Sequence, residues 1–178
     1  MRHRIPGRPR QRDPEGMSSP RLLIGRRSVR GAYYMLTSNV ADRQKLFVDA
    51  ARVECVVEAL RCSDREARSR TLAWVVMPDH VHWLMQLRDG NISRCMQSFK
   101  SRASRAFNLL TGAQGSVWQR GFYDHCIRSD ESLEGQAQYL IENPVRAGLT
   151  ASVGEYPYAW SRWPMASEPA PTAQCQPT

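Results

Sequence analysis

The sequence predicts a single α+β domain in which a central antiparallel sheet is flanked by helices. The length of 178 residues suits one domain with tails, and a hydrophobic content of 42% is enough to build a core. Strand-like and helix-like patterns follow one another in the order strand, helix, strand, strand, helix, strand, helix. This order is typical of an antiparallel sheet covered by helices.

The first four elements are predicted from local patterns in the N-terminal half of the chain. Residues 32–37 are expected to form a strand and residues 45–61 a helix. Two apolar runs, 72–77 and 81–87, flank the dipeptide Pro78-Asp79. Because Pro and Asp favour turns, these two runs are predicted to be paired strands.

The C-terminal half is predicted to contain two helices with an irregular strand region between them. Residues 91–110 show the clearest helical period of apolar side chains. Residues 116–128, with Gly121 near their centre, are interpreted as an irregular or bulged strand pair. A last helix is expected to start at Ser129 or Asp130 and to end near Asn143, because the residue before Pro144 avoids helical geometry.

Both ends of the chain are expected to lie outside the folded domain. Residues 1–26 combine arginines with prolines and glycines and are interpreted as a flexible basic arm. Residues 164–178 are rich in Pro, Ala, Thr and Gln and are predicted to be a disordered tail. The folded domain is therefore expected to span residues 27–163.

The charge of the chain points to nucleic acid. The net charge is +8, and of the 25 basic residues only Lys45 and Lys100 are lysines. The planar guanidinium of arginine binds phosphate and stacks on bases. A genome rich in G and C would also raise the Arg to Lys ratio, but it would not explain the net charge.

The sequence predicts a cytosolic protein without membrane segments or disulfides. No run approaches 18 uninterrupted apolar residues, and the N-terminus lacks the apolar stretch of a secretory signal. An odd number of cysteines without a Cys-x-x-Cys pair indicates free thiols. The five are Cys55, Cys62, Cys95, Cys126 and Cys175.

His80-Val81-His82, at the start of the strand predicted after the Pro-Asp turn, is a candidate metal site. Alternate residues of a strand point to the same side, so the two imidazoles share one face. Two neighbouring imidazoles form a chelating pair, but an isolated His-x-His also occurs by chance and needs a further partner. Asp79 is expected to serve the turn, with orientation of a histidine as the alternative.

Tyr139 is the unusual residue of the last predicted helix. At about 100° per residue, the apolar stripe of that helix does not include Tyr139, which shares a flank with Gln136 and Asn143. A tyrosine outside the apolar stripe is either a half-exposed surface residue or a group that acts outside its own helix.

Taken together, these motifs resemble the single-tyrosine HUH endonucleases, specifically the IS200-like Y1 transposases and, among them, the REP-associated tyrosine transposases. The resemblance covers about residues 27 to 163 and implies an RRM-like or ferredoxin-like fold. The matching stretches are Met77-Pro78-Asp79-His80-Val81-His82, Ser98-Phe99-Lys100, Val117-Trp118-Gln119-Arg120-Gly121-Phe122-Tyr123-Asp124-His125 and Tyr139-Leu140-Ile141-Glu142-Asn143-Pro144-Val145-Arg146-Ala147-Gly148-Leu149.

The resemblance implies roles for the motif residues. His80 and His82 would hold Mg²⁺ or Mn²⁺, and Tyr139 would be the nucleophile. Asn143, one turn later, would be the third ligand, where related transposases often carry the longer Gln. DNA-binding candidates come from the basic side of helix 91–110, from the aromatic and basic stretch after it, and from the last motif: Lys100, Arg102, Arg105, Trp118, Arg120 and Arg146.

The implied reaction is cleavage and rejoining of single-stranded DNA through a 5′-phosphotyrosine intermediate, on hairpins of palindromic REP repeats. We expect a magnesium- or manganese-dependent transposase in the cytoplasm and nucleoid of a bacterium. A monomer is favoured over a homodimer. Three alternatives stay open. They are a non-catalytic module that binds single-stranded nucleic acid, a metal-dependent hydrolase that adds His125 to the histidine pair, and a replication or plasmid-transfer nickase.

Overall fold

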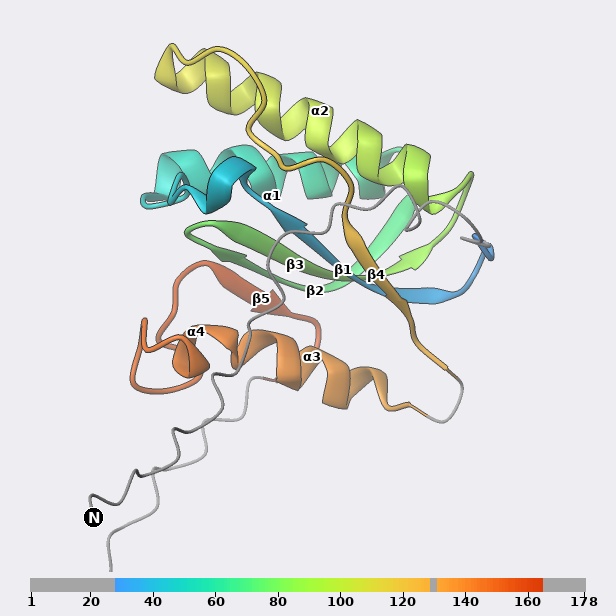
Figure 1. Ribbon diagram of the computed structural model, residues 1–178. Coiled ribbons are helices and arrows are strands. Elements are labelled where there is room, and N and C mark those ends of the chain that lie inside the picture. Colours follow the sequence, from blue (N-terminus) through green and yellow to red (C-terminus); the bar gives the residue numbers. More distant parts are fainter. Residues whose placement is uncertain (1–27, 129–130, 165–178) are drawn as a thin grey trace, which may run out of the picture.

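The computed structural model describes residues 28–128 and 131–164. Five strands form one antiparallel sheet in the order β4-β1-β3-β2-β5. Without β5, the β1-α1-β2-β3-α2-β4 succession is ferredoxin-like, which confirms the predicted fold class (Figure 1). The strands are β1 (Tyr33–Asn39), β2 (Ser69–Met77), β3 (His80–Leu87), β4 (Tyr123–Cys126) and β5 (Ala159–Ser161).

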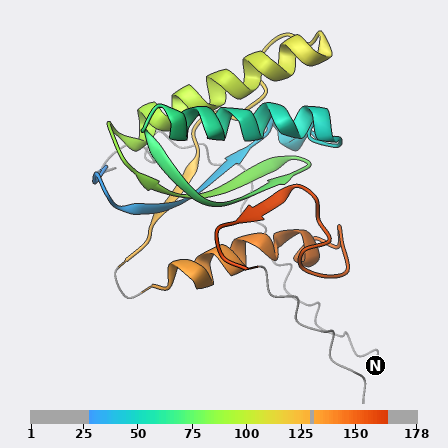
Figure 2. The same cartoon turned by 180° about the vertical axis from the view of Figure 1, so that it is seen from behind.

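Helices cover both faces of the sheet. α1 (Ala50–Arg65) and α2 (Ile92–Thr111) pack side by side on one face, and α3 (Leu133–Ile141) with the short α4 (Asn143–Arg146) lies on the other (Figures 1 and 2). No helix within the described ranges is long and apolar enough to cross a membrane.

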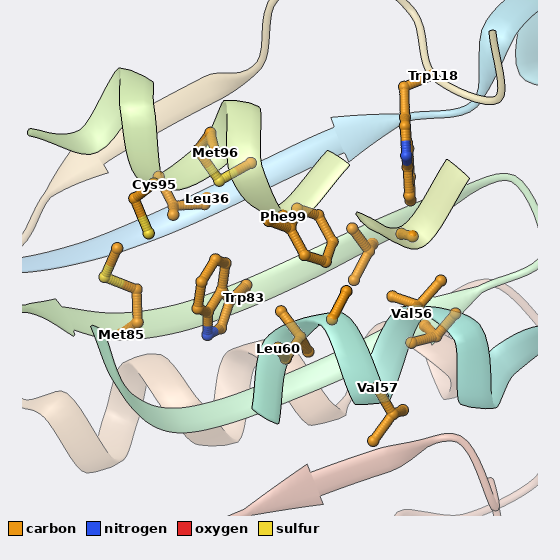
Figure 3. Packing of buried hydrophobic residues seen from close by; sticks show 14 of the residues in the cluster. Leu36, Val56, Val57, Leu60, Trp83, Met85, Cys95, Met96, Phe99 and Trp118 are labelled. Carbon is orange, nitrogen blue, oxygen red and sulfur yellow. The ribbon is translucent and has the colours of Figure 1, made fainter. Parts of the chain in front are cut away.

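The larger hydrophobic core lies between the sheet and the α1–α2 layer. Trp83 from β3 contacts Phe99 from α2, with their ring centroids 5.4 Å apart. Phe99 in turn contacts Trp118, which belongs to the loop before β4, at 5.7 Å (Figure 3). This stack fixes both α2 and the loop before β4 on the sheet.

A second core lies between the sheet and α3. It includes Leu84 from β3, Val75 from β2, and Leu140 and Ile141 from α3, all buried. Because side chains alternate along β3, Leu84 belongs to the same face of the sheet as His80 and His82. The α3 helix is therefore packed on the face that carries the histidine pair.

Local signals explain where the helices begin. Asp49 accepts a hydrogen bond from the Arg52 amide at 2.9 Å, so α1 starts at Ala50 and not at the predicted residue 45. Asn91 caps α2 in the same way, and Gly112 (φ 71°) ends it, which confirms that helix. Ser132 caps α3 through the Gly135 amide at 3.1 Å.

Further details of the secondary structure differ from the sequence-based expectations. The predicted start of the last helix, Ser129 or Asp130, lies outside the described ranges, and α3 begins only at Leu133 because Ser132 is its cap. Residues 116–128 contribute one short strand, β4, which pairs with β1 and not with another part of the same segment. The strand β5 was not predicted, because three residues carry too little periodicity.

Pro144 does not stop the helical course of the chain as predicted. α3 ends at Ile141, and α4 starts at Asn143 with Pro144 in its first turn. A proline is tolerated there because the first N–H groups of a helix have no intrahelical acceptor. The predicted arm 1–26 and the part of the tail from 165 to 178 lie outside the described residues, as does Cys175. The other four cysteines are free thiols.

Candidate active site

The two histidines of β3 face each other. The Nε2 atoms of His80 and His82 lie 3.1 Å apart, and the two rings meet edge to face. Val81, between them, is buried on the opposite side of the strand. The period of a β-strand thus produces the shared face that the sequence predicted.

The separation of the two nitrogens suits one shared cation. Two ligand atoms about 2.1 Å from an ion and at a right angle to each other are separated by roughly 3.0 Å. The observed 3.1 Å between the two Nε2 atoms matches this value. The distance between the two Nε2 atoms is therefore that expected for two adjacent ligands of an octahedral metal site.

The other ring nitrogens are anchored, which fixes the direction of both Nε2 atoms. His80 Nδ1 is 2.6 Å from the Asp79 carboxylate. This nitrogen therefore carries the proton and donates a hydrogen bond to the carboxylate. Nε2 of neutral His80 then presents a lone pair. His82 Nδ1 is 2.7 Å from Thr37 Oγ1, on the neighbouring strand β1. Asp79 thus orients a histidine in addition to forming the turn, which was the less favoured interpretation of the sequence.

The surroundings of the pair favour neutral imidazoles. Burial, followed by electrostatic interactions with His80 when it is protonated, with Arg146 and with Arg43, lowers the pKa of His82 to about 3. Burial also lowers the pKa of His80, although Asp79 opposes this shift. Metal ligands must be deprotonated, so both rings are in the form that binds a cation at neutral pH.

Tyr139 projects from α3 into solvent. Its side chain is 61% exposed, whereas Ala137, Leu140 and Ile141 of the same helix are buried. The Arg146 guanidinium lies over the tyrosine ring, with Cζ 4.1 Å from the ring centroid. Arg146 also donates to the Tyr139 carbonyl and to the Glu142 carboxylate. These contacts hold the ring from one side and leave the phenol exposed.

Asn143 and Arg146 are the first and last residues of α4, and both donate to backbone carbonyls of α3. Asn143 Nδ2 donates to the Leu140 carbonyl at 2.7 Å, so its Oδ1 is the end of the amide that is suited to a cation. Arg146 lies near enough to His82 for its charge to lower the pKa of that imidazole. Within residues 28–128 and 131–164, no group of three His, Cys, Asp or Glu side chains forms a metal site.

The predicted DNA contacts fall on different parts of the molecule. Arg102 and Arg105 belong to α2, on the opposite side of the sheet from the histidines, and Arg102 pairs with Glu66 (Figure 1). Arg120 is exposed in the loop before β4. Of the predicted DNA-binding residues, the structure places Arg146 at the histidine pair.

Trp118 does not fit its predicted role in base stacking. Its side chain is only 4% exposed, because the ring packs between Phe47 and Phe99. Its indole N–H donates to the Lys100 carbonyl at 3.2 Å. A ring enclosed in this way has no free face for a base, so Trp118 is a core residue.

Lys100 is bound to the protein itself. Its ammonium group donates to the Gln119 carbonyl at 2.9 Å and to the Gly121 carbonyl. Burial lowers the pKa of Lys100 to about 8. Lys100 therefore anchors α2 to the turn that presents Arg120.

His125 does not join the histidine pair. It lies on β4, two strands away from β3, where its Nε2 is 3.1 Å from both oxygens of Glu131. The hydrolase interpretation required His125 as a third metal ligand beside His80 and His82. The contact with Glu131 gives His125 a structural role at the start of the α3 region.

Sequence reasoning missed two residues that contact the histidines or their supports, Thr37 and Arg43. Thr37 was hidden in a predicted strand, although its register opposite His82 follows once β1 and β3 are paired. Arg43 bonds Asp79, and its position depends on a turn that has no sequence signal. Tyr123, 53% exposed, is a second exposed tyrosine and lies opposite Thr37 on β4.

Comparisons with known proteins show the family to which this chain is related. Residues 28–143 match the family model described as IS200-like transposase. A Haemophilus influenzae protein described as a candidate REP-associated tyrosine transposase is 28% identical over 141 residues, covering 73% of this chain and 80% of that protein. The REP-associated tyrosine transposase of Escherichia coli K12 is 26% identical over 133 residues, covering 74% and 77%.

A solved structure, of a REP-associated tyrosine transposase bound to a REP hairpin, shares the fold. The TM-score is 0.62 at 24% identity, and the match covers 75% of this chain and 79% of the other. The family model spans β1 to the first residue of α4, and thus both histidines and Tyr139. This chain belongs to the IS200-like transposases, a family of DNA-cleaving enzymes.

Proposed function

We propose that this transposase cleaves and rejoins single-stranded DNA at REP-type hairpins through a covalent bond to Tyr139. The observation that carries the proposal is that Arg146 acts on both elements of the site. Its guanidinium lies over the ring of the exposed Tyr139, and its charge lowers the pKa of His82. The REP target is supported by the names of the two bacterial relatives and by the hairpin in the related solved structure.

In the proposed reaction, the phenol oxygen of Tyr139 attacks a phosphorus of the DNA backbone. The phenol loses its proton to solvent, and a new bond forms between its oxygen and the 5′ phosphate. The bond to the preceding 3′ oxygen breaks, and that oxygen takes up a proton from solvent and leaves as a 3′-OH. The product remains a phosphodiester, so a 3′-OH can later attack it and release the tyrosine without ATP.

His80, His82 and the Asn143 amide oxygen are the residues that would hold a divalent cation. Two nitrogens and one oxygen suit Mn²⁺, and Mg²⁺ when water fills the other positions. When bound, the cation polarises the scissile phosphate and stabilises its negative charge. The chain itself contributes a pair of neutral imidazoles whose orientation is fixed by Asp79 and Thr37.

Basic residues on several surfaces are proposed to bind the DNA strand. Arg146 lies at the tyrosine and binds the phosphate next to the point of attack. Arg120, presented by the turn that Lys100 anchors, and Arg102 and Arg105 on α2 bind more distant phosphates. The catalytic domain of residues 27–163 is proposed to act as a monomer in the bacterial cytoplasm, with the basic segment 1–26 adding phosphate contacts.

The adduct assay tests the proposed function directly. The full chain is incubated with Mn²⁺ and a labelled single-stranded oligonucleotide that contains a hairpin. We expect a protein–DNA band that survives denaturing electrophoresis, and none with the fully paired duplex. Free cleaved ends without an adduct would support a hydrolase instead, and binding without cleavage would support a non-catalytic module.

Binding should weaken steeply with salt. Neutralised phosphates release counterions, so a plot of log affinity against log salt should fall by about 0.7 per phosphate contact on single-stranded DNA. Replacing Arg120 with Gln should reduce this slope by one contact. Fluorescence anisotropy at several salt concentrations measures the slope, and a slope near zero for the unmodified protein would contradict recognition led by phosphates.

The histidine pair should make folding stability sensitive to acid. The pKa of His82 is about 3 in the folded chain and about 6.5 when unfolded. Between these values the unfolded state binds more protons, so stability falls as the pH drops below 6.5, by about 2 kcal/mol at pH 5. Urea unfolding should show that His82→Asn removes most of this loss. Equal losses in both proteins would refute a neutral buried His82.

A further inference from the structure

Arg43 has no role in the reaction as described above, yet it contacts the support of the histidine pair. Its Nε lies 3.1 Å from Asp79 Oδ2, while the other carboxylate oxygen of Asp79 lies 2.6 Å from His80 Nδ1. Its Nη1 donates to Asn39 Oδ1 at 2.7 Å. One guanidinium thus joins the end of β1 to the turn between β2 and β3.

The backbone at Arg43 is unusual. Asp42 and Arg43 are consecutive residues with positive φ, 53° and 55°. Residues other than glycine rarely adopt this left-handed conformation, and such outliers gather at functional sites when surrounding contacts hold them. Here the contacts with Asp79 and Asn39 hold the arginine, and the left-handed turn directs it toward the hairpin that carries His80.

The charge of Arg43 also acts on the site. It is one of the causes that lower the pKa of both His80 and His82, so the guanidinium lies close to the pair. Asp79 is partly buried, with its side chain 21% exposed. An ionised carboxylate in that position needs partners for both oxygens, and Arg43 supplies the second one.

We propose that Arg43 is a positioning residue of the metal centre. It fixes the Asp79 carboxylate in the orientation in which Asp79 accepts a hydrogen bond from His80 Nδ1, and this directs His80 Nε2 toward the cation. Planar, two-armed contacts are a property of arginine that lysine does not share. The inference rests on the proposed function, because it assumes that His80 and His82 hold a cation.

The hydrogen-bond network of Arg43 extends to α2. Asn39, which accepts from Arg43, donates to Gln119 Oε1 at 3.3 Å, and its carbonyl accepts from the Gln119 amide at 2.9 Å. Lys100 binds the carbonyl of the same Gln119. A continuous chain of contacts therefore runs from α2 through Asn39 and Arg43 to His80.

The test measures Mn²⁺ binding directly, by electron paramagnetic resonance of the free ion, in the full chain without DNA. Arg43→Asn removes the guanidinium, and asparagine tolerates the left-handed backbone. We expect about tenfold weaker Mn²⁺ binding, the lower end of the usual effect of losing a group that orients a metal ligand. Arg43→Lys should lie between this variant and the unmodified protein. Arg61→Gln, on α1, removes an exposed arginine paired with Glu54 and should change nothing.

A double substitution separates action through Asp79 from an independent effect. If Arg43 works through Asp79, Arg43→Asn combined with Asp79→Ala should bind Mn²⁺ as weakly as Asp79→Ala alone, within about twofold. If the losses of Mn²⁺ affinity in the two single variants multiply in the double variant, the inference is overturned. Wild-type Mn²⁺ affinity in Arg43→Asn or in Arg43→Lys would overturn it as well.

A second measurement makes failure of the inference distinguishable from failure of the proposed function. The hydrogen-bonded His80 Nδ1 proton should give a downfield proton resonance in the metal-free protein, which Arg43→Asn should shift or broaden and Arg61→Gln should not. If the unmodified protein binds no Mn²⁺, the metal centre of the proposed function fails. An unchanged resonance in Arg43→Asn overturns the positioning role by itself.

Discussion

Tyr139→Phe is expected to abolish the covalent protein–DNA adduct and to lower the rate of strand cleavage at least about 10³-fold. Removal of a nucleophile has effects of this size or larger, because no other group of the site provides the attacking oxygen. DNA affinity should change little, since the ring, its contact with Arg146 and the basic surfaces remain. Denaturing electrophoresis and anisotropy measure the two properties on the same protein samples.

Tyr123→Phe is the matched control for this experiment. Tyr123 is also an exposed tyrosine, and it lies on β4 opposite Thr37, the residue that bonds His82. The control should form the adduct at the wild-type rate. An adduct that persists in Tyr139→Phe and disappears in Tyr123→Phe would transfer the nucleophilic role to Tyr123.

Replacing either histidine of the pair with alanine is expected to lower cleavage by about 10²- to 10³-fold. Electrostatic stabilisation of phosphate by a bound cation amounts to several kcal/mol, and each 1.36 kcal/mol corresponds to a factor of ten. The chelator EDTA should lower cleavage by the unmodified protein to the same degree, and added Mn²⁺ should restore the cleavage rate. His125→Ala is the control, because His125 bonds Glu131 and lies two strands away.

The Mn²⁺ concentration needed for cleavage shows whether the two histidines act by binding a cation. His80→Ala and His82→Ala should need much more Mn²⁺ for half-maximal cleavage, whereas His125→Ala should need the same amount as the unmodified protein. Full activity of the unmodified protein in excess chelator would show that the histidine pair serves the reaction without a cation.

The sequence predicted the fold and the histidine pair because both depend on short-range periods. The alternation that buries Val81 and Trp83 also turns His80 and His82 to the other face of β3. The helical period likewise excluded Tyr139 from the core stripe, and the tyrosine is exposed. These properties follow from residue spacing within one element.

Other features depended on packing between distant elements and were beyond local patterns. Trp118 resembled an exposed base-stacking residue, yet Phe47 and Phe99 enclose it. Nothing in the spacing of His80 and Tyr139 required α3 to pack on the histidine face, and that placement depends on Leu84 and Leu140 sharing one core. Arg43 reaches Asp79 through a left-handed turn that no sequence pattern predicts.

Mapping the protein–DNA linkage tests the central claim most directly. The unmodified protein is reacted with Mn²⁺ and a hairpin-bearing single strand, digested with protease and nuclease, and analysed by mass spectrometry. We expect a nucleotide bound through its 5′ phosphate to the peptide that contains Tyr139, with a free 3′-OH on the released DNA. A linkage to another residue, a 3′ phosphate bond, or cleaved ends without any bound peptide would contradict the proposed mechanism.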